Sequence, residues 1–423
     1  MNSIQDLTEF PLYDLQDKSF YKEGKYWIPP VNHLPEVLEG YPSKAQIHDV
    51  TLSDGEQTPG VTFTEDERVR IAECLNDIGV ARIEAGMPVV SETQMRALKR
   101  IAKAGHRSMI TAFARANPKD IQLALESGCQ GVIVEHAMNP YFNKICYKLT
   151  PGMLVERIAT SLKAAKNADF FTVFMGWDWF RSPIDYTRWV VDRVLNEVQF
   201  DALSIVDTYG SATPDSVAYM FKKFHAWFPD LQLEFHGHND SSLGVACALS
   251  ALKNGASVVH TSLNGLGGRS GNVATEEFAN AAQTLYQIDC GIRMERIYPN
   301  SQVLAEISKM PISSGKCIIG ARPYQIETGI STHVVRTFSP MGINPIQTSY
   351  DPSYFGIPGG MQFVLGKNSG TASIEIFLDK YGLSATKDQI NAILEKLKAE
   401  AMVTKALISE TQFLAIYDNV VNS

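Results

Sequence analysis

Short runs rich in hydrophobic and β-branched residues recur between residues 45 and 285, and stretches with helical features separate them. An alternation of strand and helix predicts a parallel sheet, because each helix carries the chain back to the edge where the next strand starts. We expect eight strands: Gln46–Leu52, Ala81–Ala85, Met109–Ala112, Gly131–Glu135, Phe171–Met175, Ala202–Val206, Gln232–Phe235 and Ser257–Leu263.

Helix-start and helix-stop signals support this alternation. Thr64 with Glu67, and Ser91 with Gln94, have the spacing of a capping box. The residues before a proline at an expected helix start, typical of an N-cap, are Asn117, Thr150, Ser182 and Thr213. Glycines at positions 79, 105, 128 and 255 stand where helices should end.

Eight βα units over some 240 residues favour a closed barrel over an open, doubly wound sheet, because such barrels take about 250 residues. We therefore predict an α/β protein, a (β/α)8 TIM barrel over residues 45–300. Residues 1–44, rich in aromatic residues and proline, predict an N-terminal arm. A Gly/Pro/Ser-rich connector over 301–370 leads to a small C-terminal α+β or helical subdomain over 371–423. Its expected helices are Ala372–Tyr381, Gln389–Lys405 and Glu410–Val421.

Composition narrows the class of protein. The chain has 423 residues, of which 45% are hydrophobic and 20% charged, as in globular proteins. Its net charge of -8 repels phosphate backbones and anionic lipid surfaces, so we expect neither a nucleic-acid nor a membrane partner. No leader-like segment and no long apolar run are present, which predicts a cytoplasmic location. Six cysteines without a CxxC pair fit reduced thiols.

The ends of the predicted strands carry candidate metal ligands. Asp54 follows the first strand, and His236 and His238 end the seventh, two residues apart, so both point the same way. In a barrel these strand ends meet at one rim. Two imidazoles and a carboxylate suit a divalent ion, and Asn272 offers a fourth ligand. We predict a divalent metal site and leave the ion open among Mn, Mg and Zn, although an Asp before a Gly is also a common turn former.

Other strand ends carry further candidates. Glu84 lies at the end of the second strand, where a charged side chain is expected to have either an ion-pair partner or a functional role. Arg269, in the glycine-rich segment after the eighth strand, can meet a carboxylate. Glu135 and His136 end the fourth strand, and one of them should face inward as an acid/base candidate, with a surface position equally compatible. Trp177, after the fifth strand, predicts an apolar pocket wall or simple core packing.

Six motifs in the same order resemble the metal-dependent family that includes 2-isopropylmalate, homocitrate and citramalate synthases and, more distantly, 3-hydroxy-3-methylglutaryl-CoA lyase. They are TLSDGEQTPG (51–60), IEAGMPVVS (83–91), DTYGSATP (207–214), HGHND (236–240), NGLGGRSGNVATEE (264–277) and FVLGKNSG (363–370). The similarity covers about residues 45–400. It implies a metallo-barrel that makes or breaks a carbon–carbon bond next to a carboxylate or thioester.

The resemblance also implies roles for single residues. Asp54, His236 and His238 match the metal ligands, and Asn272 completes or adjoins the site. Glu84 matches the functional glutamate of the family. The implied reaction condenses acetyl-CoA with a 2-oxo acid, by Lewis-acid and general-base chemistry. The candidate substrate contacts are His48, Ser53, Gln57, Trp177, Thr208 and Thr213.

The chain departs from the family pattern at several positions. Ser53 replaces the arginine of the usual LRDG motif, a loss of about 3 kcal/mol in transition-state stabilisation. Arg269 and His48 are candidates for the missing donor, and a structural role is at least as compatible with each of them. The connector histidine, His333, is displaced by two positions from the family's E-S-G-I-H segment, and Tyr354 matches its companion tyrosine.

These departures leave alternatives open beside condensation. One is a metal-dependent aldolase or lyase that works without CoA, and another is an inactive metal-binding homologue. The connector is long for a structureless loop within one compact domain, which favours a homo-oligomer, a dimer or larger.

Overall fold

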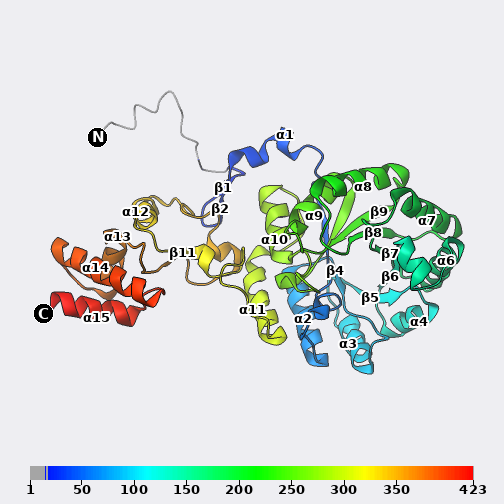
Figure 1. The fold of residues 1–423 in the computed structure, drawn as a ribbon, viewed down its shortest axis with the longest axis horizontal. Coiled ribbons are helices and arrows are strands. Elements are labelled where there is room, and N and C mark those ends of the chain that lie inside the picture. Colours follow the sequence, from blue (N-terminus) through cyan, green and yellow to red (C-terminus); the bar gives the residue numbers. More distant parts are fainter. Residues whose placement is uncertain (1–14, 16–17, 423) are drawn as a thin grey trace. The chain divides into compact units, whose positions relative to one another are not determined.

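A computed structural model describes residue 15 and residues 18–422. Eight parallel strands close into a barrel in the order β10-β3-β4-β5-β6-β7-β8-β9 (Figure 1). The strands are β3 (Gln46–Asp49), β4 (Arg82–Glu84), β5 (Met109–Arg115), β6 (Gly131–Ala137), β7 (Phe171–Trp177), β8 (Ala202–Asp207), β9 (Gln232–Gly237) and β10 (Ala256–Thr261). The predicted TIM barrel is confirmed, and each predicted strand overlaps one of these eight.

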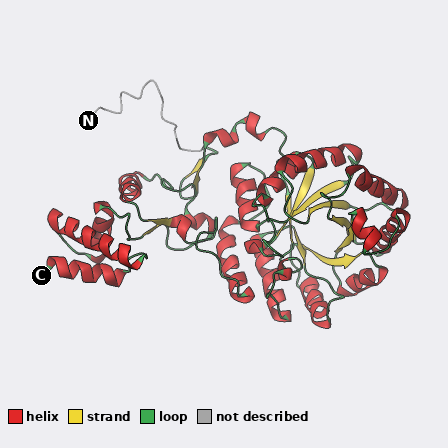
Figure 2. Ribbon diagram, in the orientation of Figure 1, coloured by secondary structure: helices red, strands yellow, loops and turns green. Residues whose placement is uncertain are grey.

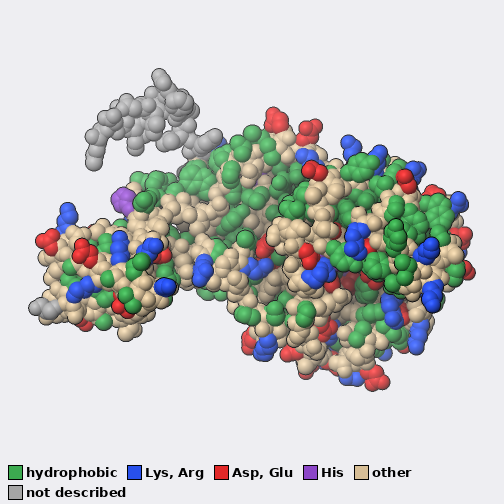
Figure 3. Space-filling view, in the orientation of Figure 1, with side chains coloured by type: hydrophobic (Ala, Val, Ile, Leu, Met, Phe, Trp, Pro, Cys, Tyr) green, Lys and Arg blue, Asp and Glu red, His purple; other side chains and the backbone are tan. Residues whose placement is uncertain are grey.

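Helices surround the barrel (Figure 2). They are α2 (Glu65–Ile78), α3 (Glu92–Lys103), α4 (Pro118–Ser127), α6 (Pro151–Asn167), α7 (Ile184–Glu197), α8 (Pro214–Trp227), α9 (Gly244–Lys253), α10 (Thr275–Asn280) and α11 (Ile297–Ser308). A short additional helix, α5 (Pro140–Ile145), precedes α6. None of the helices in the described residues is long and apolar enough to cross a membrane. Figure 3 shows Lys and Arg interspersed with Asp and Glu over the barrel helices.

Most of the predicted caps are confirmed. Thr64 and Glu67 form a capping box, and Asn117, Thr150 and Thr213 are N-caps. Two predictions differ from the structure. Ser91 caps α3, but the Gln94 side chain accepts from Met87 N at 3.2 Å and does not close the box. Ser182 is not the cap of α7, because Pro183 takes that position and the Ser182 hydroxyl donates to the Asp178 carbonyl.

The barrel interior has an apolar half and a polar half. Strands β6, β7 and β8 contribute a buried cluster of Ile133, Val173, Met175, Ala202 and Val206, against which Phe113 and Phe171 pack. The neighbouring strands β9, β10, β3 and β4 contribute buried polar side chains instead: His48, Arg82, Glu84, Glu234, His236 and His260. Burying ionisable groups is costly unless they are paired or serve a task, so this half of the barrel is where chemistry is expected.

The chain divides into two compact units: Pro35–Ile312, which contains the barrel, and the residues before 35 together with those from Ser313 onward. In this second unit β1 (Tyr21–Lys22) pairs with β2 (Tyr26–Trp27). Trp27 N donates to Ser349 O at 2.9 Å, and Asp351 N donates to Lys25 O at 2.8 Å. The N-terminal arm is thus hydrogen-bonded to the connector.

The connector itself contains regular structure. It holds α12 (Gly329–Phe338) and a parallel pair formed by β11 (Gln325–Ile326) and β12 (Gln362–Phe363). The predicted C-terminal helices are confirmed within two residues of their ends, as α13 (Thr371–Tyr381), α14 (Lys387–Thr404) and α15 (Glu410–Val421). They share a buried core that includes Phe377, Leu397 and Phe413, and Leu365 of the connector joins it.

Candidate metal centre and active site

Three of the predicted metal ligands meet at the carboxyl-terminal rim of the barrel. Asp54 lies in the turn after β3, which Gly55 N closes by donating to Val50 O at 2.9 Å. His236 is on β9 and His238 follows that strand. Their Nε2 atoms lie 3.3 and 3.4 Å from Asp54 Oδ2. Each of the three residues offers a ligand atom, and these atoms lie within 4.8 Å of one another.

Asn272 completes this group of residues. It forms a β-bridge with His238, and its Nδ2 donates to Leu266 O at 2.9 Å. Within the described part of the chain, Asn272 Oδ1 is a buried oxygen that accepts no hydrogen bond. Gly267 permits this close approach, since a Cβ there would lie 2.5 Å from Asn272 Nδ2. A buried, unused oxygen beside a carboxylate and two imidazoles fits a divalent cation.

The electrostatics of the cluster also suit a cation. Burial disfavours the charged form of Asp54, but His236, His238 and Asn272 outweigh it and lower the pKa of this carboxyl to about 2. Burial, and then the nearby His236, lower the pKa of His238 to about 4. At neutral pH the cluster thus offers a carboxylate and a neutral His238 imidazole, which are the protonation states that metal binding requires.

Glu84 lies beside this cluster. This residue is 2% exposed, and burial raises the pKa of its carboxyl, while the Ser53 hydroxyl acts in the opposite direction. His48 Nε2 lies 3.5 Å from Glu84 Oε2. Where the family pattern has an arginine, this chain therefore has a hydroxyl, which donates to Val50 O at 3.2 Å and favours the charged form of the Glu84 carboxyl.

Of the two candidates on β6, Glu135 shares the interior with the metal-site carboxylates. Burial, and then the charges of Glu84 and Asp54, raise the pKa of Glu135 to about 8, so its carboxyl is protonated at neutral pH. His136 lies on the other face of β6, where its ring packs against Tyr147 with centroids 5.1 Å apart. We retain Glu135 as an acid candidate and leave His136 out of the proposed machinery.

Glu135 predicts a pH dependence of stability. Its carboxyl has an ordinary pKa of 4.5 when unfolded and about 8 when folded. Between these values the folded chain holds a proton that the unfolded chain has released, so stability falls as pH rises. Relative to Glu135→Gln, the wild type should lose up to about 1.4 kcal/mol per pH unit in this window, less where solvent screens the group. Urea unfolding of both chelated proteins at several pH values measures this, and parallel curves would contradict it.

The other rim candidates make contacts that fix the loops. The Trp177 ring packs against Phe142, with centroids 4.9 Å apart. Thr208 Oγ1 accepts from Asp178 N at 2.7 Å. Thr213 is the N-cap of α8, so its hydroxyl is already used by that helix.

Arg269 is also held in place at the rim. Its Nε donates to Asp240 Oδ1 at 2.9 Å, and its Nη2 donates to the Thr208 carbonyl at 2.5 Å. This arginine is therefore paired with a carboxylate of the chain, and its role as the donor missing at Ser53 stays a prediction.

A cavity of about 170 Å³ lies beside Ser53, and Gln57 contributes to its lining. Phe113 and Met87 form apolar parts of the wall, and Glu56 and Gln94 form polar parts. The Glu56 carboxylate is paired with the buried Arg68 guanidinium. The space next to Ser53 therefore has both an apolar surface and hydrogen-bonding groups.

Two predicted catalytic residues lie in the second compact unit. His333 is an exposed residue of α12. Tyr354 lies in the 3-10 helix Pro352–Phe355, and its ring contacts Tyr26 of the N-terminal arm with centroids 5.6 Å apart. Their catalytic roles stay predictions.

Sequence reasoning missed three ionisable residues of the polar half. Arg82, Glu234 and His260 are 3%, 0% and 1% exposed, and Arg82 Nη2 lies 2.6 Å from Glu234 Oε1. The available signal was alternation, because Arg82 lies two residues before Glu84 and Glu234 two residues before His236. Charged residues at inward positions of a strand mark a polar interior.

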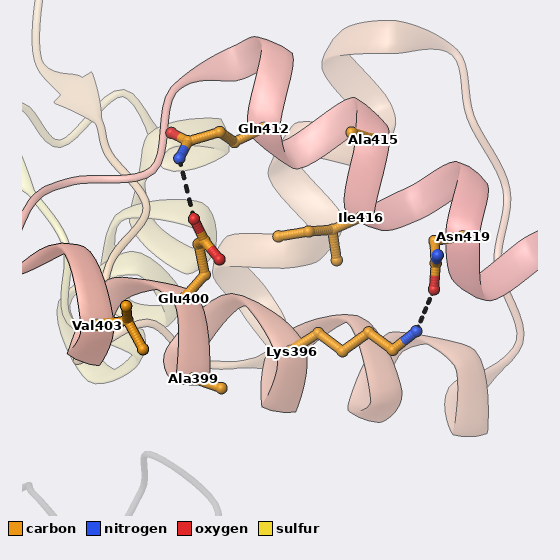
Figure 4. A pocket seen from close by; sticks show the side chains of 8 residues that line it. All are labelled: Lys396, Ala399, Glu400, Val403, Gln412, Ala415, Ile416 and Asn419. Carbon is orange, nitrogen blue, oxygen red and sulfur yellow. Dashed lines mark hydrogen bonds between the residues drawn. The ribbon is translucent and has the colours of Figure 1, made fainter.

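A second cavity, of about 530 Å³, lies between α14 and α15 (Figure 4). Lys396 bonds to Asn419, and Gln412 Nε2 donates to Glu400 Oε1 at 3.4 Å. Its lining residues include one carboxylate and one ammonium group, and neither histidine nor cysteine. We therefore place the candidate chemistry in the barrel.

The closed barrel and the Asp-His-His-Asn cluster at its rim define the class: a (β/α)8 barrel with a candidate divalent-metal site. The chain belongs to the HMGL-like family, whose model matches residues 44–304. The resemblance predicted from the six motifs is thereby confirmed.

The chain is 33% identical over 365 residues to a probable 2-isopropylmalate synthase of Ignicoccus hospitalis, covering 86% of this chain and 90% of that protein. It is 30% identical over 376 residues to homocitrate synthase AksA of Methanothermobacter thermautotrophicus, covering 88% and 93%. A solved HMG-CoA lyase of Bacillus subtilis is similar in fold, with a TM-score of 0.59, 23% identity and coverage of 65% of this chain and 97% of that one.

Proposed function

We propose that this protein is a divalent-metal-dependent enzyme that condenses acetyl-CoA with a 2-oxo acid. The observation that carries the proposal is the convergence of Asp54, His236 and His238 at the rim, with the unused Asn272 Oδ1 beside them. The names of the curated relatives, 2-isopropylmalate and homocitrate synthases, support this class of reaction.

Each group of residues has a separate role in the proposed reaction. Asp54, His236, His238 and Asn272 hold the ion, which when bound supplies Lewis-acid polarisation of a carbonyl group. Glu84 is the general base that takes a proton from the acetyl methyl group, with its carboxylate form favoured by the Ser53 hydroxyl. Glu135, protonated at neutral pH, is the acid that gives a proton to the developing alkoxide.

The direct test mixes the purified protein with Mn²⁺ or Mg²⁺, acetyl-CoA and a panel of 2-oxo acids, and follows the release of free thiol. Condensation gives a product that is still a CoA thioester, and water then cleaves this thioester to a carboxylate and free CoA thiol. We therefore expect metal-dependent thiol release with at least one 2-oxo acid. Chelated protein is the control. If metal-bound protein releases no thiol with any 2-oxo acid of the panel, the proposal is contradicted.

Ser53 favours a second candidate, an aldolase or lyase reaction without a CoA thioester, because the charged donor of the condensing pattern is missing. Ser53→Arg separates the two. The cavity of about 170 Å³ gives the new side chain room. If the protein condenses acetyl-CoA, a restored guanidinium should raise kcat about tenfold or more. Ser53→Ala is the matched control, and indifference to Ser53→Arg would favour the second candidate.

We also propose that the protein is a homo-oligomer, on the length of the connector. Light scattering should give at least twice the 46.8 kDa of the single chain. A monomer would contradict this expectation without touching the proposed reaction.

A further inference from the structure

The polar half of the barrel holds a second set of side chains that the proposed reaction does not use. His48, Glu234 and His260 each offer one ligand atom, and these atoms lie within 4.8 Å of one another. All three side chains are buried. Two imidazoles and a carboxylate repeat the donor set of the Asp54 cluster, so the residue types alone are compatible with a second metal ion.

Arg82 already supplies a cation to this set. Its Nη2 donates to Glu234 Oε1 at 2.6 Å, and His260 Nε2 donates to Glu234 Oε2 at 2.8 Å. Because a carboxylate only accepts, His260 carries a proton on the nitrogen that faces Glu234. A metal ion would have to displace this proton and lie beside the cationic guanidinium of Arg82. The charge of Glu234 is therefore balanced without a metal.

The same residues connect to the candidate base. The His260 ring stacks on the His48 ring, with centroids 4.4 Å apart and planes 19° apart. His48 Nε2 in turn lies 3.5 Å from Glu84 Oε2, and each of these two buried atoms has no hydrogen-bond partner in the described part of the chain, so they approach each other without forming a hydrogen bond. Burial, and then the Arg82 guanidinium, hold the pKa of His48 well below its usual range, so its ring is neutral. In the strand register, Arg82 on β4 is paired with His48 on β3, and His48 is paired with His260 on β10. These residues therefore form one row across three neighbouring strands.

We propose that Arg82, Glu234, His260 and His48 form a positioning column that fixes the carboxyl group of Glu84, and that Arg82 replaces a second metal ion in it. The catalytic part of this inference rests on the proposed function, in which Glu84 is the base. In this inference the four residues act through Glu84 and not directly on substrate, which replaces the substrate contact predicted for His48. Groups that orient an active residue in this way typically change its activity about 10- to 100-fold when removed.

The activity test uses paired variants. His48→Phe keeps a ring for stacking but removes Nε2, and His260→Leu removes the donor to Glu234. Both should lower kcat about 10- to 100-fold and change KM for the 2-oxo acid less than about threefold. His260→Gln keeps an amide donor and should stay within about threefold of wild type. Ser161→Ala, which changes a buried hydroxyl of α6 that donates to Arg157 O at 3.0 Å, is the control and should match wild type.

A double-mutant cycle tests whether the column acts through Glu84. His48→Phe should have no further effect on kcat in the Glu84→Gln background, because the group that it positions is already gone. Additive losses would overturn the inference. Equal losses in His260→Gln and His260→Leu would also overturn it, because the donor would then not matter. If His260→Leu does not fold, His48→Phe and His260→Gln decide the question.

Two measurements need no activity. Metal analysis of protein saturated with Mn²⁺ should find one ion per chain in wild type and in His48→Phe. Two ions in wild type, one of them lost in His48→Phe, would overturn the replacement of a metal by Arg82. Nitrogen-15 spectra of labelled histidines should show His260 with its proton on Nε2, and the other tautomer would overturn the assignment. If no 2-oxo acid is turned over, the proposed function fails, and these readouts still decide the role of Arg82.

Discussion

Asp54→Asn should abolish metal binding and activity together. Asp54 is the one anionic ligand of the cluster, because the other three donors are two imidazoles and an amide. The change keeps the shape of the side chain and removes its charge, so the attraction for a divalent cation falls steeply. We expect bound metal to fall from one ion per chain to less than about a tenth of that, and thiol release to fall at least about 10³-fold.

Metal analysis after gel filtration and a thermal unfolding series check this prediction. Metal should stabilise the wild type, by about 4 kcal/mol at a thousandfold excess over Kd, and should not stabilise Asp54→Asn. Asp201→Asn is the matched control, since Asp201 precedes β8 and pairs with Lys166 at 2.9 Å. An Asp54→Asn protein that keeps its ion would refute the assignment of the cluster.

Glu84→Gln should stop the reaction while leaving the metal in place. The amide has the shape of the carboxyl group and still fits the buried position beside Ser53 and His48, but it cannot take a proton. Removing a general base typically lowers kcat about 10²- to 10⁴-fold. Initial rates at saturating substrate measure the loss, and metal analysis shows whether the ion stays.

The comparison variant is Glu197→Gln, which makes the same chemical change on α7 in an exposed pair with Lys163. It should behave as wild type in both measurements. Full activity in Glu84→Gln would assign the base to another group. Loss of the ion in Glu84→Gln would make Glu84 part of the metal site and not the base.

The metal cluster could be predicted from the sequence because barrel geometry leaves little freedom. His236 and His238 are two residues apart at a strand end, so they point the same way wherever that strand lies. The carboxyl-terminal ends of all strands meet at one rim in a barrel, which brings Asp54 to the two histidines although it lies far from them in the sequence. Alternation and topology were sufficient for these three residues.

The positioning column could not be predicted in the same way. Its contacts depend on which strands are neighbours across the closure of the barrel, where β10 pairs with β3. Arg82 and Glu234 lie 152 residues apart, and the sequence around either residue does not indicate that the other is its partner. Thr213 shows a different limit, because its residue type and its place suit both a substrate contact and a helix cap. In the structure its Oγ1 accepts from Ser216 N at 3.2 Å as the cap of α8, and the substrate contact stays a prediction.

The buried pair of Arg82 and Glu234 has a consequence for how the chain reaches its native state. Arg82 is made early and Glu234 late, and each is costly to bury without the other. A nascent chain that ends before β9 lacks Glu234, the counter-ion of Arg82. Without it, β4 cannot be buried in a water-free barrel interior at low cost. Half-barrels of this protein should stay open and hydrated, and ring closure should be delayed until the final strands emerge from the ribosome.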